Sequence, residues 1–485
     1  MPKVLFVYHN ELEEGFMPAS LAVLGGVMKA AGVESKLFDT SFWKDKNSKI
    51  KENDRQVREK TGEFKKVSGF NPEREVVDLK EKFLEVVEEF KPDLIAATST
   101  SYEFNSLIDF MLPAKNKFNI LVIVGGSHTT VAPEKAIQKE GVDIVCVGEG
   151  EKALLELAKR IEQKQSFNDI PNLWVKTPAG EVIKNDVAPQ IEMDDLPEPD
   201  WDLFDARHRA RPFEGELKNY GFFEISRGCP FSCSYCINAK LHEIYRSFPN
   251  SKLFRFHSPE EIVRRIKKFK EKYSFNHIQF VDENLSVMPL ETLKKLADLY
   301  SKEIGVGFFM MARPEGIVAE PEKAKIFAKM GCRMAALGAE SGNEALKKAI
   351  LNRPMKNETL EKAAKLLKDA GILVSIYNII GFPTETKEMI FDTIRLNRKI
   401  QPDRYSVRFL VPYPGTAIRK YCEEKGYIDP DYEETIGNVS FLIEPVLNLP
   451  SPPHPTKQEL MDIKMNWKNY LKMSDEEFEK IARNS

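Results

Sequence analysis

The feature that most constrains the fold is a series of short, nearly unbroken apolar runs in the first part of the chain. Such runs occupy residues 3–8, 35–39, 93–100, 120–126 and 143–151, and each leads into a pattern typical of helices. Strands with Val, Ile and Leu at consecutive positions are buried on both faces, as in a parallel sheet covered by helices. The pattern therefore predicts an α/β fold with a doubly wound, Rossmann-like sheet.

A second alternation of strands and helices begins near residue 221. Helical patterns such as PEEIVRRIKKFKEK separate six expected strands: 221–227, 277–285, 305–313, 333–341, 373–383 and 405–415. Repeated βα units form either an open parallel sheet or a barrel. Most of the polar, motif-like residues follow the strand ends, where both architectures bind ligands.

The remaining segments indicate the domain organisation. The stretch 191–205, IEMDDLPEPDWDLFD, is rich in acidic residues and proline, which predicts an extended linker. We therefore expect a first domain at 1–195, a second at 196–425 and a C-terminal extension at 426–485. The highly charged insertion at 44–91 is expected to be a solvated helix or a mobile loop rather than a binding element.

Composition and charge limit the classes of partner. Of 485 residues, 42% are hydrophobic and 30% charged, and the formal net charge is −3. A folded protein without excess positive charge is indicated, so neither nucleic acid nor an anionic membrane is expected as a partner. No apolar run reaches the ~18 residues that cross a bilayer, and the N-terminus reaches acidic residues too soon for a secretory signal. We therefore expect a cytoplasmic protein.

Three of the six cysteines, Cys229, Cys233 and Cys236, share one loop with the spacing C-x3-C-x2-C. Six cysteines in so long a chain do not suggest a disulfide framework, whereas three clustered thiolates could hold zinc or an iron–sulfur cluster. Structural zinc usually has four ligands, and His242, the nearest histidine, lacks the usual spacing. Iron–sulfur cubanes normally take four cysteines, so three leave one iron open.

This spacing, with the aromatic Tyr235 just before the last cysteine, resembles the radical S-adenosylmethionine (SAM) superfamily. The resemblance implies that Cys229, Cys233 and Cys236 are catalytic and hold a [4Fe-4S] cluster, whose fourth iron binds the amino and carboxylate groups of SAM. In that family, reduction of the cluster cleaves SAM to a 5′-deoxyadenosyl radical. The resemblance also implies a partial (β/α)6 TIM-type barrel and an external electron donor of the flavodoxin or ferredoxin type.

Later strand ends resemble other parts of that family's SAM pocket. The residues that the resemblance assigns to SAM are Asp282, Glu283, Arg313, Glu340, Ser341, Ile379, Gly381 and Glu385. VDEN resembles the element that meets the amino group, GAES the element near the ribose and carboxylate, and NIIGFPTE the element against adenine. The planar fork of Arg313 can pair with a carboxylate. Taken singly, such residues are more often helix caps or turns.

The first domain lacks the glycine motifs of common nucleotide sites. Neither G-x-G-x-x-G nor a P-loop follows its first strand, so NAD and ATP are poor candidates. Its connection PASLAVLGGVMKAAG and its strand ends VGGSHTT and VGEGE resemble the cobalamin-binding domain found in front of many radical SAM modules. The residues expected to contact cobalamin are Ser99, Thr100, Gly125, Gly126, His128, Gly148 and Gly150.

The histidines bear on how cobalamin would be held. None of the seven has Asp two residues before it, so the D-x-H-x-x-G pattern of methionine-synthase-type domains is absent. The resemblance implies a cobalt without a histidine below it, which would ease formation of the nucleophilic Co(I) state. His128 is therefore expected to contact the corrin or its tail rather than cobalt.

The combined resemblance implies a cobalamin-dependent radical SAM enzyme, and we favour a methyltransferase. One SAM would methylate Co(I), and a second would give the radical that takes hydrogen from an unactivated carbon of a small-molecule or peptide substrate. That carbon would then receive the methyl from methylcobalamin.

Two alternatives remain open. One is a non-methylating cyclase or oxidase, because PYPGT and GAES also resemble the anaerobic magnesium-protoporphyrin ester cyclases. The other is a cobalamin carrier or sensor with a non-catalytic cluster. A methylthiotransferase is disfavoured, since that family has a second cysteine trio where this chain has Cys146 alone.

The sequence says little about the substrate. Strand alternation turns only half of residues 308–311 toward a barrel interior, and core packing explains them adequately. Tyr377 and Arg408 are candidates for facing the reaction chamber, and nothing in the sequence decides this.

Overall fold

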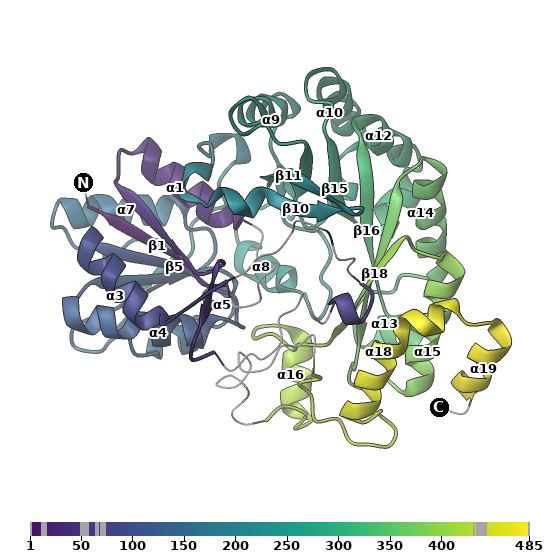
Figure 1. Cartoon of the computed structure of the whole chain (residues 1–485). Coiled ribbons are helices and arrows are strands. Elements are labelled where there is room, and N and C mark those ends of the chain that lie inside the picture. The colour runs from purple at the N-terminus through teal and green to yellow at the C-terminus, as the bar shows by residue number, and fades with distance from the viewer. Residues whose placement is uncertain are drawn as a thin grey trace.

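The computed structural model describes residues 2–10, 17–48, 58–63, 67, 74–429, 432 and 444–483. These residues form two α/β bodies that lie side by side, the second of which runs from β10 (Ala210–Phe213) to the C-terminal helices (Figure 1). Each body is built on its own seven-stranded sheet. The α/β class predicted from the two series of apolar runs is confirmed.

The first sheet has the order β2-β1-β5-β6-β7-β8-β9, with β8 and β9 antiparallel and the others parallel. Its strands are β1 (Val4–Tyr8), β2 (Ser35–Asp39), β5 (Leu94–Thr98), β6 (Leu121–Gly125), β7 (Ile144–Cys146), β8 (Leu173–Lys176) and β9 (Val182–Lys184). The strand order reverses between β1 and β5. Doubly wound sheets bind ligands at this point, outside the carboxyl ends of the strands.

Helices cover both faces of this sheet, as its two-sided apolar strands require. They are α1 (Ala19–Ala30), α3 (Leu79–Phe90), α4 (Phe104–Phe118), α5 (Ser127–Val131), α6 (Pro133–Gln138) and α7 (Glu151–Glu162). Alternate residues of β1 enter different cores. Val4 and Phe6 pack on the side of α1 and α7, whereas Leu5 and Val7 pack on the side of α3 and α4.

The second sheet has the order β10-β11-β14-β15-β16-β17-β18, with six parallel strands and β10 as an antiparallel edge. The parallel strands are β11 (Glu216–Phe223), β14 (His277–Phe280), β15 (Gly307–Ala312), β16 (Cys332–Glu340), β17 (Leu373–Ile380) and β18 (Arg404–Phe409). Two small ribbons pair β3 (Trp43–Asp45) with β4 (Glu75–Val77) and β12 (Ser226–Arg227) with β13 (Arg255–Phe256). The second sheet curls into the partial barrel expected from six βα units (Figure 1).

The helices of the second body lie mostly on the outer face of the curled sheet, but α8 lies between the two bodies (Figure 1). They are α8 (Ile237–Tyr245), α9 (Pro259–Tyr273), α10 (Leu290–Glu303), α11 (Pro314–Ala319), α12 (Glu322–Met330), α13 (Glu344–Ala349), α14 (Asn357–Asp369), α15 (Lys387–Ile400), α16 (Ala417–Glu424), α18 (Lys457–Lys472) and α19 (Asp475–Arg483). Phe308 and Met310 are fully buried, whereas Phe309 and Met311 are partly exposed. The expected strand alternation within 308–311 is therefore present.

The segment 191–205 is not a free extended linker, which corrects the prediction. It contains the 3-10 turns η1 (Met193–Asp195) and η2 (Trp201–Leu203). Trp201 is 1% exposed, and its ring packs on Phe223 and Phe269 in the core of the second body. Apolar residues spaced among the acidic ones thus anchor the segment.

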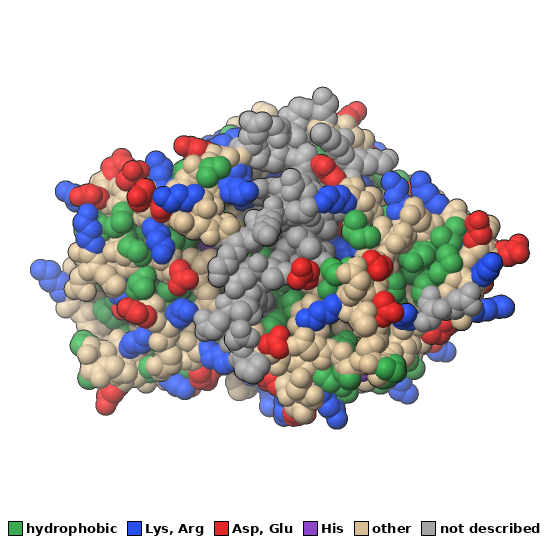
Figure 2. Space-filling model, turned by 60° about the horizontal axis from the view of Figure 1, so that its bottom comes forward, with side chains coloured by type: hydrophobic (Ala, Val, Ile, Leu, Met, Phe, Trp, Pro, Cys, Tyr) green, Lys and Arg blue, Asp and Glu red, His purple; other side chains and the backbone are tan. Residues whose placement is uncertain are grey.

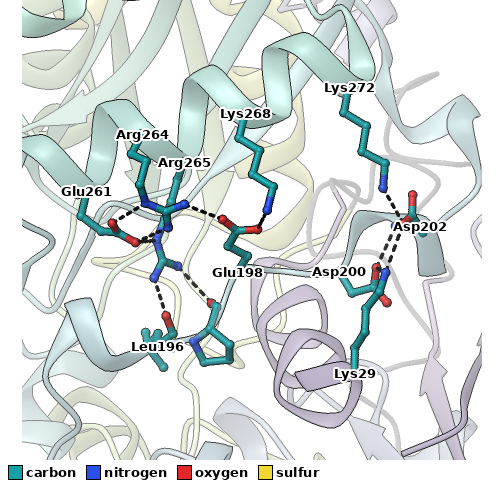
Figure 3. Close-up of polar contacts among 11 residues, drawn as sticks. Lys29, Leu196, Glu198, Asp200, Asp202, Glu261, Arg264, Arg265, Lys268 and Lys272 are labelled. Carbon is teal, nitrogen blue, oxygen red and sulfur yellow. Dashed lines mark hydrogen bonds and ion pairs between the residues drawn. The ribbon is translucent and has the colours of Figure 1, made fainter. Parts of the chain in front are cut away.

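The acidic residues of this segment find basic partners on both domains (Figure 3). Glu198 pairs with Arg264 at 2.7 Å and with Lys268 at 2.5 Å, and both partners lie on α9. On the other side, Lys29 of α1 contacts Asp200 at 2.8 Å. The segment therefore fastens α1 to α9 instead of running through solvent.

Part of the charged insertion at 44–91 also corrects the prediction. Residues 58–63 lie against the open edge of the second sheet, where the hydroxyl of Tyr405 donates to the carbonyl of Thr61 at 3.0 Å. Thr61 is buried, and Glu63 forms an ion pair with Arg408 at 2.6 Å. These contacts hold this stretch in the fold, while residues 49–57, 64–66 and 68–73 lie outside the described residues.

The last helices extend the packing of the second body. Trp467 of α18 is fully buried in a core that also contains Ile380, Phe391 and Phe409. No helix in the described ranges is long and apolar enough to cross a membrane. On the face shown in Figure 2, acidic and basic side chains are interspersed.

Candidate active site between the two domains

The three cysteines lie in the loop that follows β11. The loop passes through β12 and ends at α8, where Cys236 is the N-terminal flanking residue. Cys229 and Cys233 are buried, Cys236 is half-buried, and all three thiols are free. Burial raises the pKa of Cys236, and the charges of Cys233 and Cys229 raise it further. The three sulfurs therefore lie within electrostatic reach of one another.

Each sulfur faces a side-chain hydrogen-bond donor. Arg313 Nη1 lies 3.2 Å from the sulfur of Cys233, and Asn284 Nδ2 lies 3.8 Å from that of Cys229. Asn238 donates to the third sulfur at 3.6 Å. No three His, Cys, Asp or Glu side chains in the described part of the chain converge as a metal-ion site. The donor set nevertheless fits a cluster, because hydrogen bonds stabilise the thiolates that bind iron.

The two acidic residues of VDEN hold the base of the cysteine loop. Asp282 Oδ1 accepts hydrogen bonds from the backbone N–H groups of Ile225 and Ser226 and from the Ser226 hydroxyl. Glu283 Oε2 accepts from the N–H of Gly228 at 3.1 Å. Burial raises the pKa of both carboxyls. Asp282 Oδ2 is buried and has no hydrogen-bond partner among the described residues, so it retains one acceptor.

Arg313 is held by several groups at the end of β15. Its guanidinium donates to Glu315 at 2.5 and 3.2 Å and stacks on the ring of Phe231, 3.7 Å away. Its backbone N–H donates to Asn284 Oδ1 at 3.1 Å. The guanidinium fork that was predicted to pair with a carboxylate in the SAM pocket thus already binds the carboxylate of Glu315, and its remaining nitrogen contacts Cys233.

Glu340 and Ser341 follow β16 in an irregular backbone. Glu340 has a φ of 60°, and the β16–β17 register shifts between Gly338 and Glu340. Burial raises the pKa of Glu340, while the charge of Arg353 and a hydrogen bond from Tyr235 lower it. Ser341 is buried, and its hydroxyl accepts from the N–H of Asn343 at 3.1 Å. Glu340 therefore lies beside the cysteine loop, whereas Ser341 makes a local turn contact.

Glu385 organises the turn after β17. Its Oε2 accepts from the N–H groups of Gly381 at 2.6 Å and Phe382 at 3.1 Å. Its Oε1 is buried without a hydrogen-bond partner among the described residues, and burial raises the pKa of Glu385 to about 8. Gly381 has a φ of 81°, and Ile379 packs in the same apolar cluster as Tyr235.

Glycines bring backbone close together at the carboxyl edge of the first sheet. Gly126 has a φ of 101°, and a Cβ there would lie 2.6 Å from the carbonyl oxygen of Ser99. Gly148 has a φ of 79° and lies directly against the hydroxyl of Tyr245 from α8. Only glycine combines these conformations with such close approach. The second contact joins the two domains.

Ser99, Thr100 and His128 have protein partners. The Ser99 hydroxyl donates to the carbonyl of Thr100 at 2.7 Å, and the Thr100 hydroxyl contacts Glu103. His128 is buried, with Nδ1 3.0 Å from the hydroxyl of Ser101 and its ring stacked 4.2 Å from Phe104. Ser99 and His128 are buried in the first domain, whereas Thr100 is exposed.

A cavity of about 410 Å³ connects the two domains. Its walls include Gly125, Gly126, Gly148 and Gly150 from the first domain, and Glu283 from the second. Leucines of α1 and α7 make one side apolar. Ser99, Thr100 and His128 do not line this described cavity. An apolar space at the strand-order reversal suits a flat, weakly polar group such as an aromatic base.

Charged residues lock the domains together beside the cavity. Arg227, two residues before the first cysteine, pairs with Glu151 at 2.7 Å, Glu224 at 2.9 Å and Glu149 at 3.5 Å. Arg255 also contacts Glu149. Glu149 and Glu151 flank α7 in the first domain, so these pairs set the position of the cysteine loop against the first sheet.

Two family models match this chain. The B12 binding domain matches residues 11–158, and the Radical SAM superfamily matches residues 223–396. The fold and the cysteine site thus define a radical SAM enzyme that carries an N-terminal B12-binding domain. The chain belongs to the cobalamin-binding group of the radical SAM superfamily, whose cofactors are a [4Fe-4S] cluster, SAM and cobalamin.

Known proteins similar to this chain include enzymes of two kinds. The anaerobic magnesium-protoporphyrin IX monomethyl ester cyclase of Rubrivivax gelatinosus is 24% identical over 435 residues, covering 87% of this chain and 70% of the cyclase. An uncharacterized methyltransferase of Pyrococcus horikoshii is 26% identical over 340 residues, covering 70% and 71% of the two chains. The solved structure of OxsB with aqua-cobalamin and SAM bound has a TM-score of 0.67 at 15% identity, and the match covers 100% of this chain and 70% of OxsB. At that identity the structural likeness concerns the fold.

Proposed function

We propose that the protein is a cobalamin-dependent radical SAM methyltransferase that moves a methyl group from SAM, by way of cobalamin, to an unactivated carbon. The cavity shared by the two domains carries this proposal. The ends of β6 and β7 face the cysteine loop across it, so groups held at the two edges would meet in one chamber. Relatives named as methyltransferases support the choice of reaction.

The chain's own residues would hold and shield the reacting groups. Cys229, Cys233 and Cys236 would bind the cluster. Bound there, the cluster and SAM supply a carbon radical and cobalamin supplies the methyl carrier. Glu283 and Glu385 keep the neighbouring turns in place through backbone N–H groups, and the buried free oxygen of Glu385 suits a hydrogen-bonding group of SAM. The other residues assigned from the resemblance remain predictions, as does a flavodoxin- or ferredoxin-type electron donor.

The walls of the cavity would exclude water from this chemistry. Apolar side chains of Leu21, Leu24 and Leu154 line it on the side of the first domain. Tyr245 closes the approach beside Gly148. A radical that is kept from solvent reacts with the positioned substrate instead of with stray hydrogen donors.

A second candidate is a non-methylating cyclase or oxidase. One observation favours it: the cyclase of Rubrivivax gelatinosus aligns with 87% of this chain, whereas the methyltransferase of Pyrococcus horikoshii aligns with 70%. Both reactions would use the same cavity. They differ in whether SAM gives up its methyl group.

The experiment that tests the proposal needs no substrate. The anaerobically reconstituted protein, with cobalamin bound and reduced, is mixed with SAM carrying a deuterated methyl group, and the products are measured by mass spectrometry. A methyltransferase is expected to form about one S-adenosylhomocysteine per bound cobalamin, with the deuterated methyl recovered on the extracted cobalamin. 5′-Deoxyadenosine and labelled methionine without S-adenosylhomocysteine would refute methyl transfer and favour the second candidate.

A further inference from the structure

The described part of the charged insertion brings an ion pair to the open edge of the half-barrel. Glu63 contacts Arg408 of β18 at 2.6 Å and lies 3.9 Å from Arg58 Nε. The Glu63 side chain is 1% exposed, whereas Arg58 and Arg408 each keep 26% of their side chains exposed. Guanidinium groups from two domains therefore converge on one buried carboxylate and remain partly accessible.

Among the described residues of this cluster, arginines outnumber carboxylates. Arg404 projects from the same face of β18 as Arg408, four positions earlier, and lies over the ring of Phe213 at 5.2 Å. Burial raises the pKa of Tyr377, while the charges of Arg58, Arg408 and Arg404 lower it, so all three arginines lie within electrostatic range of this phenol. Burial and the charge of Arg408 lower the pKa of Arg58 to about 10. Arg58 and Arg408 thus face the carboxylate of Glu63, and Arg404 lies on the same face of β18 as Arg408.

The cluster lies next to the predicted SAM pocket. Arg408 is directly opposite Ile379 in the β17–β18 register, and Tyr377 is opposite Ser406. Neighbouring strands are about 4.8 Å apart. A molecule beside Ile379 in the half-barrel would therefore be within reach of the guanidinium of Arg408.

We propose that Arg58, Arg404 and Arg408 form the anion-binding part of the substrate site, and that the substrate carries a carboxylate or a phosphate. This inference rests on the proposed function, because it assumes that a substrate is held in the half-barrel beside SAM. Planar guanidinium forks bind both oxyanions in bidentate fashion. Glu63 already shows that the cluster accepts a carboxylate, and it competes with an incoming anion for Arg408.

The test uses saturation-transfer NMR on the reconstituted full-length protein. The probes are phenyl phosphate, benzoate and the neutral benzyl alcohol, which share one aromatic ring. The variants are Arg58→Gln, Arg408→Gln and Glu63→Gln. Arg160→Gln is the matched control, since Arg160 pairs with Glu156 on the distant helix α7.

Anion binding is expected to weaken about tenfold in each of the first two variants, because each loses a charge-assisted hydrogen bond. Glu63→Gln is expected to tighten it by a similar factor, since that change removes the competing carboxylate while leaving the cations. Arg160→Gln is expected to change nothing. A variant that merely loosens the fold cannot explain changes in opposite directions.

Each outcome decides the proposal. Binding of phenyl phosphate alone, benzoate alone or both supports it and identifies the oxyanion. Equal binding of all three probes, or weaker anion binding in Glu63→Gln, overturns it. If Arg408→Gln does not fold, the opposite changes in anion affinity expected for Arg58→Gln and Glu63→Gln still test the proposal. No turnover is measured, so failure of methyl transfer in the deuterated-SAM experiment remains a separate result.

Discussion

Replacing Arg227 by methionine tests the electrostatic lock between the domains. Its side chain is 15% exposed and faces three glutamates from two domains. Arg255 still contacts Glu149 in the variant, so the loss falls on Glu151 and Glu224, which are 8% and 24% exposed. Methionine keeps most of the side-chain volume, so the change isolates the charge.

The expected loss is about 3 kcal/mol of unfolding free energy, the lower end of the cost of leaving a buried charge without its partner, because Glu224 keeps some solvent. Urea unfolding of the reconstituted protein, followed by tryptophan fluorescence, measures it. Adding Glu151→Gln to Arg227→Met is expected to recover about 1 kcal/mol or more, since it removes the uncompensated carboxylate. A single variant within about 0.5 kcal/mol of wild type, or losses that simply add in the double variant, would refute the reasoning.

Two further predictions concern residues beside the expected cobalamin and SAM sites. Gly126→Ala is expected to lower cobalamin affinity about tenfold or more, because its Cβ would press on the carbonyl of Ser99; visible absorbance after gel filtration measures bound cobalamin. Gly180→Ala, also at positive φ but with open space around it, is the control, and equal losses in both variants would contradict the explanation. Burial raises the pKa of Glu385 from 4.5 to about 8, so between these values the folded protein keeps a proton that the unfolded chain releases. The free energy of unfolding that this group contributes therefore falls as the pH rises through that window, and Glu385→Gln should make the fall smaller. The measurement is the urea unfolding midpoint of each protein at pH 5.5 and pH 8. An equal change of midpoint between these two pH values in wild type and variant would count against the prediction.

The strands could be predicted closely because apolar periodicity is a local property. β2 spans Ser35–Asp39, the run expected at 35–39, and the other runs expected in the first domain contain their strands in the same way. In the second domain the agreement is looser, since β11 begins at Glu216, five residues before the run expected at 221–227. The insertion was misjudged because its charge suggested solvent. Glu63 is buried only since Arg408, 345 positions later in the chain, supplies a partner. Composition cannot report a contact across that separation.

The linker was misjudged for a related reason. Its acidic, proline-rich composition indicated an extended linker, yet Arg264 and Lys268 on α9 bind Glu198 and hold the segment against the second domain. Long-range charge pairing of this kind depends on how α9 is oriented, which the sequence of 191–205 does not contain.

The site was predictable where chemistry is concentrated in one short segment. Three cysteines at fixed spacing point to a cluster whatever the fold around them. Asn284 was inside the quoted VDEN stretch, and Glu315 follows Arg313 by two residues, so proximity to a motif was the available signal for both. For Arg227 only the nearby Glu224 was such a signal, because Glu149 and Glu151 come from the other domain.

Electron paramagnetic resonance of the dithionite-reduced, reconstituted protein, recorded with and without SAM, tests the central claim most directly. Three cysteine ligands predict a reduced [4Fe-4S] signal that shifts when SAM binds the open iron, and alanine at Cys229, Cys233 or Cys236 should abolish that shift. A spectrum that SAM leaves unchanged, or a protein that holds zinc without iron and sulfide, would contradict the account.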